Sequence, residues 1–211
     1  MTTFSLPIKC HALSDLPLNS VHKGKQDLLV LEYMAQRLAL TVQTLDAEEQ
    51  SSPPYLYLLT ERGNRTHRIV LYQPQQLLQE ANLSFVGFVS ARQIGQDATI
   101  DQGLSNADQN MLAELVHVPG LMGYSSLEIR QGCWHNLVFF AHTDTVRHLK
   151  QTESHQHAAY QLAPRAYTWI RIHVGLMTGG LAGGQMQLLR SKHYATDLTV
   201  PQFRMYEVFY V

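Results

Sequence analysis

The sequence predicts an α+β fold with the ferredoxin-like split βαβ order. Two observations support this prediction. The segment from 83 to 174 reads as strand, helix, strand, strand, helix, strand. In addition, 45% hydrophobic residues against 16% charged residues exclude the compositions that are typical of disordered chains. A chain of 211 residues is long enough for one large domain or two small ones.

The N-terminal part is expected to contain one amphipathic helix and one β-hairpin. The helix is predicted over 25–40, because apolar residues recur there at three- and four-residue spacing. These residues are Leu28, Leu31, Met34 and Leu38. The hairpin is predicted from strands at 55–60 and 67–72, which flank a turn containing Gly63 and Asn64.

The following elements define the split βαβ unit. Hydrophobic runs, caps and turn residues predict a strand at 83–91, a helix at 107–118, a hairpin of 121–129 with 134–141, a helix at 143–162 and a strand at 167–174. A glycine-rich stretch comes next, then a strand or short helix at 185–194 and a last strand at 203–211. The glycines lack the lysine and hydroxyl residue of a phosphate-binding loop, so a permissive loop is expected.

We divide the chain into an N-terminal helix and hairpin segment, 1–82, and a ferredoxin-like unit with a C-terminal strand, 83–211. The N-terminal segment either packs beside this unit or forms a degenerate half-barrel. The element order allows both arrangements, and no internal repeat decides between them.

Charge and cysteine content restrict the partners and the compartment. The chain has 16 Lys+Arg against 17 Asp+Glu and a pI near 6.8, which favours neither nucleic acid nor an anionic membrane. Cys10 and Cys133 match neither a disulfide framework nor a thiolate metal site. No secretory signal and no apolar run of about 18 residues are apparent. We therefore expect a cytoplasmic protein.

The strand at 167–174 carries the residues best suited to chemistry. Its alternation places apolar residues on one face and Tyr167, Trp169, Arg171 and His173 on the other. The guanidinium of Arg171 suits a carboxylate or enolate, and the imidazole of His173 suits proton transfer near neutral pH. This row either lines a pocket or faces solvent, with Trp169 at a dimer contact.

The segment 134–175 resembles the dimeric α/β-barrel superfamily, which includes antibiotic-biosynthesis monooxygenases, haem-degrading monooxygenases and monooxygenase-like families of unknown function. The similar features are the strand 136–140, the helix opening at 143–146, His155, residues 158–160 and the strand 167–173. In these families two ferredoxin-like sheets pack face to face, and the pocket lies between them. The resemblance thus implies a barrel pocket for a small-molecule ligand.

Aromatic residues on the strands and the helix at 143–162 bear on self-association and on haem binding. Strand-borne aromatic residues, including Trp134, Trp169 and those of 203–211, predict a homodimer. The haem-degrading branch has a tryptophan and a histidine where Leu149 and Tyr160 stand here. If haem were bound, His157 would be its ligand, on a packed helix face with the residues Val146, Leu149, Glu153 and Tyr160.

The glutamate on that face argues against a haem pocket, and the helix lacks the histidine pair of a zinc site, so we expect no cofactor and no metal. We expect His173, Arg171 and Tyr167 to be catalytic. Trp169, Trp134 and His157 are expected to contact substrate. The predicted function is a monooxygenase-like enzyme without a tightly bound metal. The alternative is a non-catalytic ligand-binding or structural protein of the same superfamily.

Overall fold

The computed structural model describes residues 16–45, 53–93, 95, 98–142, 145, 152–197 and 200–210. Its elements in chain order are α1 (Leu16–Gln43), β1 (Tyr55–Glu61), β2 (Arg65–Leu71), α2 (Pro74–Gln79), β3 (Asn82–Arg92), α3 (Ala98–Leu115), β4 (Leu121–Arg130), β5 (Cys133–Phe140), α5 (Glu153–His157), the π-helix η1 (Ala158–Leu162), α6 (Ala163–Ala166), β6 (Tyr167–Thr178), β7 (Gln185–Asp197) and β8 (Val200–Phe209). No helix among these described residues is long and apolar enough to cross a membrane.

The strands form one antiparallel sheet in the order β1-β2-β4-β5-β3-β6-β7-β8. Its four central strands, β4-β5-β3-β6, have the spatial order of the ferredoxin-like split βαβ unit. The element order and the α+β class predicted from the sequence are therefore confirmed. Helix α3 starts at Ala98, earlier than the predicted residue 107.

Flanking strands extend this central unit at both edges. The β1–β2 hairpin turns at Gly63 (φ +80°) and Asn64 (φ +55°), as predicted, and β2 pairs with β4. At the opposite edge, 185–197 is a strand rather than a short helix, and β8 pairs with it. The N-terminal hairpin thus continues the same sheet, next to the ferredoxin-like unit.

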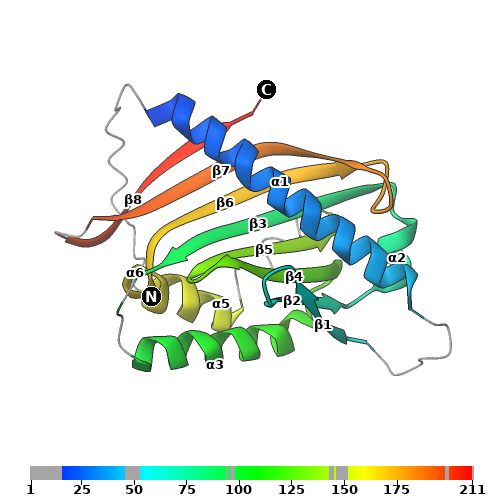
Figure 1. Cartoon of the computed structure of the whole chain (residues 1–211), viewed down its shortest axis with the longest axis horizontal. Helices are drawn as coiled ribbons and strands as arrows, with labels where there is room; N and C mark the ends of the chain where they lie inside the picture. Colours follow the sequence, from blue (N-terminus) through cyan, green and yellow to red (C-terminus); the bar gives the residue numbers. More distant parts are fainter. Residues whose placement is uncertain are drawn as a thin grey trace.

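Helices cover both faces of the sheet, with α1 running obliquely across one face and α3 and α5 lying on the other (Figure 1). Helix α1 spans 16–43, which is longer than the predicted 25–40. It approaches β3 so closely that a Cβ at Gly87 would lie 2.5 Å from Cδ1 of Leu31. A glycine therefore permits the contact between helix and sheet.

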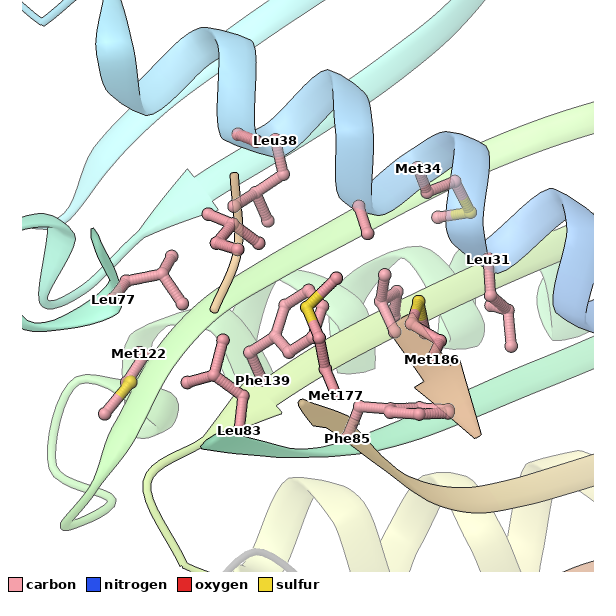
Figure 2. Close-up of a cluster of buried hydrophobic side chains, with 14 of the residues drawn as sticks. Leu31, Met34, Leu38, Leu77, Leu83, Phe85, Met122, Phe139, Met177 and Met186 are labelled. Carbon is pink, nitrogen blue, oxygen red and sulfur yellow. The ribbon is translucent and has the colours of Figure 1, made fainter. Parts of the chain in front are cut away.

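The largest core cluster lies between α1 and the sheet. Leu31, Met34 and Leu38 of α1 point toward the strands in Figure 2. They meet buried side chains from almost the whole width of the sheet, including Leu71, Leu83, Phe85, Met122, Phe139, Met177 and Met186. A second cluster, including Leu115, Tyr124 and Phe140, packs α3 on the other face. In this chain α1 therefore covers the sheet face that the sequence resemblance assigns to a barrel.

The predicted helix at 143–162 is broken into short pieces in its described part. Thr152 caps α5 by accepting a hydrogen bond from the amide of His155, and the helix widens to a π-turn over 158–162. This changes the helical phase. The prediction that Glu153, His157 and Tyr160 share a packed face is wrong, because all three are exposed. Val146 and Leu149 lie outside the described residues.

Candidate functional site

A polar cluster lies beneath the N-terminal half of α1, where Asp27 reaches the sheet. Asp27 is 5% exposed. Its carboxylate accepts two hydrogen bonds from Arg171 of β6, from Nε at 2.6 Å and from a terminal nitrogen at 2.8 Å. It also lies 2.9 Å from Nε2 of His173, which is fully buried on the same strand. Arg171 and His173, both predicted from the sequence, thus converge on one carboxylate.

Burial alone would raise the pKa of Asp27, but the hydrogen bonds from His173 and Arg171 outweigh it and lower the pKa from 3.8 to about 2. Asp27 is therefore ionised at neutral pH and can only accept hydrogen bonds. Nε2 of His173 therefore carries the N–H group and donates a hydrogen bond to Asp27. This contact identifies the tautomer of His173 as the one protonated at Nε2.

The other nitrogen of His173 starts a chain of hydroxyl groups. Nδ1 lies 2.6 Å from Oγ of Ser191, which is buried on β7. That oxygen is hydrogen-bonded to the hydroxyl of Tyr210 at 2.9 Å. Tyr210 is only half-buried. The sequence Asp27, His173, Ser191, Tyr210 therefore connects a buried carboxylate with the edge of the molecule through groups that can exchange protons.

Two further histidines flank this chain on β5 and β7. Nε2 of His135 is 3.9 Å from Oδ1 of Asp27, and the ring of His193 meets that of His173 edge to face at 6.2 Å between centroids. Burial lowers the pKa of each of these two histidines to about 4, so both are neutral at pH 7. Nδ1 of His135 and Nε2 of His193 are buried without a hydrogen-bond partner in the described part of the chain.

Trp169 completes the cluster on the solvent side. The guanidinium carbon of Arg171 lies 3.9 Å from the centroid of the Trp169 indole, a cation–π contact. Trp169 is half-buried. It therefore holds Arg171 in the plane that suits a carboxylate, and its own ring remains accessible at the edge of the cluster.

Tyr167 does not share this face, contrary to the prediction from strict alternation. The pairing of β3 with β6 slips between Ala91 and Arg92, and Thr168 donates its hydroxyl proton to the carbonyl of Ala91. This β-bulge turns Tyr167 to the side of α3 and α6, where its ring packs edge to face on Phe88 at 5.9 Å. Tyr167 is thus placed apart from Arg171 and His173.

The other two residues expected to contact substrate are also placed apart from the cluster. Trp134 lies on β5 beside His135, so it projects from the opposite face of the sheet, where Arg92 stacks over its ring at 5.6 Å. Exposed His157 lines a surface pocket together with Glu153, Gln156, Tyr160 and Gln161. Neither residue is brought to His173.

A second polar cluster of similar composition lies under the C-terminal half of α1. His67 of β2 is fully buried, with Nδ1 2.9 Å from Glu61 and Nε2 2.6 Å from Oγ of Ser125. Glu61 also accepts hydrogen bonds from the Tyr33 hydroxyl and from Nε of Arg37 at 2.9 Å. Burial alone would raise the pKa of Glu61, but these partners lower it to about 2. In this cluster, the carboxylate belongs to the sheet and not to α1.

Sequence reasoning missed five residues of the first cluster: Asp27, His135, Ser191, His193 and Tyr210. For Asp27 a signal exists, because it lies four residues before Leu31 and seven before Met34, on the apolar stripe of the helix. An acidic residue on such a stripe predicts a buried partner of opposite charge. Ser191 and Tyr210 carry no comparable signal, since their roles depend on which strands pair with β6.

The described residues contain no group of three or more His, Cys, Asp or Glu side chains arranged to hold a metal ion. At Asp27, the guanidinium of Arg171 is hydrogen-bonded to both carboxylate oxygens, which a metal ion would need as ligands. Cys133 is a free thiol, half-buried at the start of β5.

No known family model matches the chain, and no curated protein matches it. Solved structures with a partial similarity include protein SO0527 from Shewanella oneidensis, with 11% identity over 46% of this chain and 92% of that chain, and a TM-score of 0.39. They also include SnoaB, a cofactor-independent oxygenase from Streptomyces nogalater, with 16% identity over 47% of this chain and 93% of that chain, and a TM-score of 0.34. At this identity, no residue role is transferred from them.

Proposed function

We propose that the chain is a small-molecule enzyme, monooxygenase-like and without a tightly bound metal, in which His173 transfers a proton to or from an acidic organic substrate. The observation that carries the proposal is the hydrogen-bonded chain Asp27, His173, Ser191, Tyr210. A carboxylate that orients a histidine, with a hydroxyl on the other ring nitrogen, is a recurrent arrangement for acid–base catalysis.

The proposed proton route uses both nitrogens of His173. When a substrate takes the place of Asp27 at Nε2, Nε2–H gives its proton to the substrate while Nδ1 takes one from Ser191. Ser191 is reprotonated by Tyr210, and Tyr210 by water. The reverse sequence removes a proton from substrate. Arg171, held against Trp169, would stabilise the anion that proton removal leaves on the substrate.

The experiment compares the purified protein with two histidine variants. Each is incubated in air with a metabolite extract in the presence of EDTA, and consumed and formed compounds are followed by untargeted mass spectrometry. Loss of an acid–base group typically lowers rates by about 10² to 10⁴. We therefore expect turnover to be lost in His173→Gln. His67→Gln is the matched control, because His67 is equally buried between a carboxylate and a serine. Turnover that survives in His173→Gln would refute the proposal.

A specific observation favours the non-catalytic alternative as a second candidate. Both ring nitrogens of His173 and both oxygens of Asp27 are engaged within the chain. On this view the cluster only attaches α1 to the sheet. Such a protein would turn over no compound in the extract, and His173→Gln would lower its stability alone.

The predicted homodimer remains part of this proposal, and the predicted pocket is placed at the junction of α1 and the sheet. Because α1 covers the sheet face that the resemblance assigns to a barrel, the substrate would enter between α1 and the sheet. Self-association would then use the surface left exposed, which includes Leu56, Leu58 and Phe209 on the two edge strands.

A further inference from the structure

Helix α1 meets the sheet through two chemically different halves. Toward its C-terminal end, the inward positions are large and apolar, and the buried residues are Leu31, Met34, Leu38 and Val42. Toward its N-terminal end, the buried inward positions are Ser20, Gly24 and Asp27. Small and polar residues bury little apolar area. Among the described side chains of the N-terminal half, Asp27 therefore provides the ion pair with the sheet, whereas the C-terminal half packs on the sheet through the core.

The sheet surface beneath Asp27 is complementary to a carboxylate without any help from α1. Arg171 presents two parallel N–H donors, His173 presents Nε2–H, and Nε2 of His135 lies 3.9 Å away. These three groups come from two strands, β5 and β6, that hydrogen bonds place on either side of β3. Only the anion that they bind is supplied by α1. Paired donors of this kind are a common means of recognising organic acids.

Two buried ring nitrogens near Asp27 form no hydrogen bond with it. Nδ1 of His135 and Nε2 of His193 are buried and have no hydrogen-bond partner among the residues that the structure describes. His193 is only 3% exposed, so bulk water does not reach this nitrogen freely. Buried polar atoms without a partner are uncommon. Their positions on either side of Arg171 in the sheet register fit a ligand that is larger and more polar than one aspartate side chain.

We propose that Arg171, His173 and His135 form the carboxylate-binding subsite of this chain, that its ligand is a small organic acid, and that Asp27 occupies the subsite until the ligand displaces it. The proposal rests on the proposed function only for the role of His173 in chemistry. The carboxylate of the ligand takes over the hydrogen bonds of Asp27. Further oxygen atoms of the ligand reach His193.

Displacement of Asp27 exchanges one carboxylate for another, so the ion pair with Arg171 is reformed and not lost. The apolar contacts of Leu31, Met34 and Leu38 hold the rest of the helix in place. The second cluster cannot behave in this way, because its carboxylate, Glu61, belongs to β1 and remains with the sheet. It therefore provides a matched control.

Binding is measured by isothermal titration with acetate, pyruvate, benzoate and salicylate, and with benzamide as the uncharged analogue of benzoate. Asp27→Asn removes the competing anion, so the population of the open subsite rises and the carboxylate affinity should increase about tenfold or more over the native chain. Glu61→Gln should bind as the native chain does. Benzamide should gain nothing, and Arg171→Met in the Asp27→Asn background should abolish binding.

Hydrogen exchange on the native chain keeps the test independent of how well the variants fold. At a saturating concentration of the tightest carboxylate, the amides of 20–28 should exchange faster, while those of 34–42 should not change. The proposal is overturned if none of the four carboxylates binds Asp27→Asn, if Glu61→Gln gains the same affinity, or if the N-terminal half of α1 is unaffected. These readouts need no turnover. Binding without His173-dependent turnover would refute the proposed function and leave the subsite standing.

Discussion

Replacement of Asp27 by asparagine tests whether one charge joins α1 to the sheet. The substitution keeps the size of the side chain and removes the anion that accepts hydrogen bonds from Arg171 and His173. Removal of one partner from a buried ion pair costs about 3 to 5 kcal/mol, because the other partner stays buried without compensation. The Arg171 side chain is 15% exposed, so water reaches it in part. We therefore expect a loss near the lower limit, about 3 kcal/mol.

The pKa of Asp27 provides a second measure of the same interaction. A shift from 3.8 to about 2 corresponds to about 2 kcal/mol of stabilisation at neutral pH. The folded-state pKa lies below the unfolded value. The stabilisation is therefore complete above about pH 4 and is lost as the pH falls toward about 2. The free energy of unfolding of Asp27→Asn should therefore fall less than that of the native chain as the pH is lowered from about 4 toward about 2.

Urea unfolding followed by circular dichroism, at neutral pH and at several acidic values, measures both effects. Glu61→Gln serves as the comparison, because its carboxylate is bonded to fully buried His67 as well as to Arg37, whose side chain is 31% exposed. Its cost should be similar, about 3 kcal/mol, since these partners also lower the pKa of Glu61 to about 2. If the free energy of unfolding of Asp27→Asn at neutral pH lies within about 0.5 kcal/mol of the native value, the inference that this charge holds the N-terminal half of α1 is wrong.

Three further predictions concern packing and assembly. Gly175→Ala should destabilise by about 3 kcal/mol, because a Cβ there would overlap a backbone oxygen of β7. Gly24→Ala should cost less, about 1 kcal/mol, since the atoms nearest to its Cβ belong to the side chains of Tyr210 and Leu188, which can move. Equal losses in urea unfolding would contradict this. Leu31→Ala should lose about 3 kcal/mol through the cavity left in the main core, and a loss under about 1 kcal/mol would show that α1 is not anchored there. Multi-angle light scattering at micromolar concentration should give the mass of a homodimer, and a monomer would remove the assembly from the proposal.

Local patterns were sufficient to predict the central fold, since each is a property of neighbouring residues. A hydrophobic run predicts β3, alternating apolar residues predict β6, and Gly63 and Asn64 predict the first hairpin turn. Once the order strand, helix, strand, strand, helix, strand is known, short connections leave few ways to pair the strands. The face of Arg171 and His173 follows from the same alternation.

Departures from regular geometry were not predictable from these patterns. The bulge opposite Ala91 moves Tyr167 to the other face, and the π-turn over 158–162 changes which side of its helix is buried. Each inserts about one residue into a regular period: in the strand the side chains beyond it change face, and in the helix they are rotated by about 100°. The sequence contains no local mark of either event, because packing against neighbouring elements stabilises them.

The sequence by itself determined the α+β class, the split βαβ order and the polar row that contains Arg171 and His173. Only the tertiary structure decided what that row contacts. Asp27 lies 144 residues before Arg171 and meets it because α1 crosses the sheet. No periodicity within a strand or a helix records a contact of that range. The candidate site depends on how α1 packs on the sheet, and that packing follows from the buried apolar area of the whole chain.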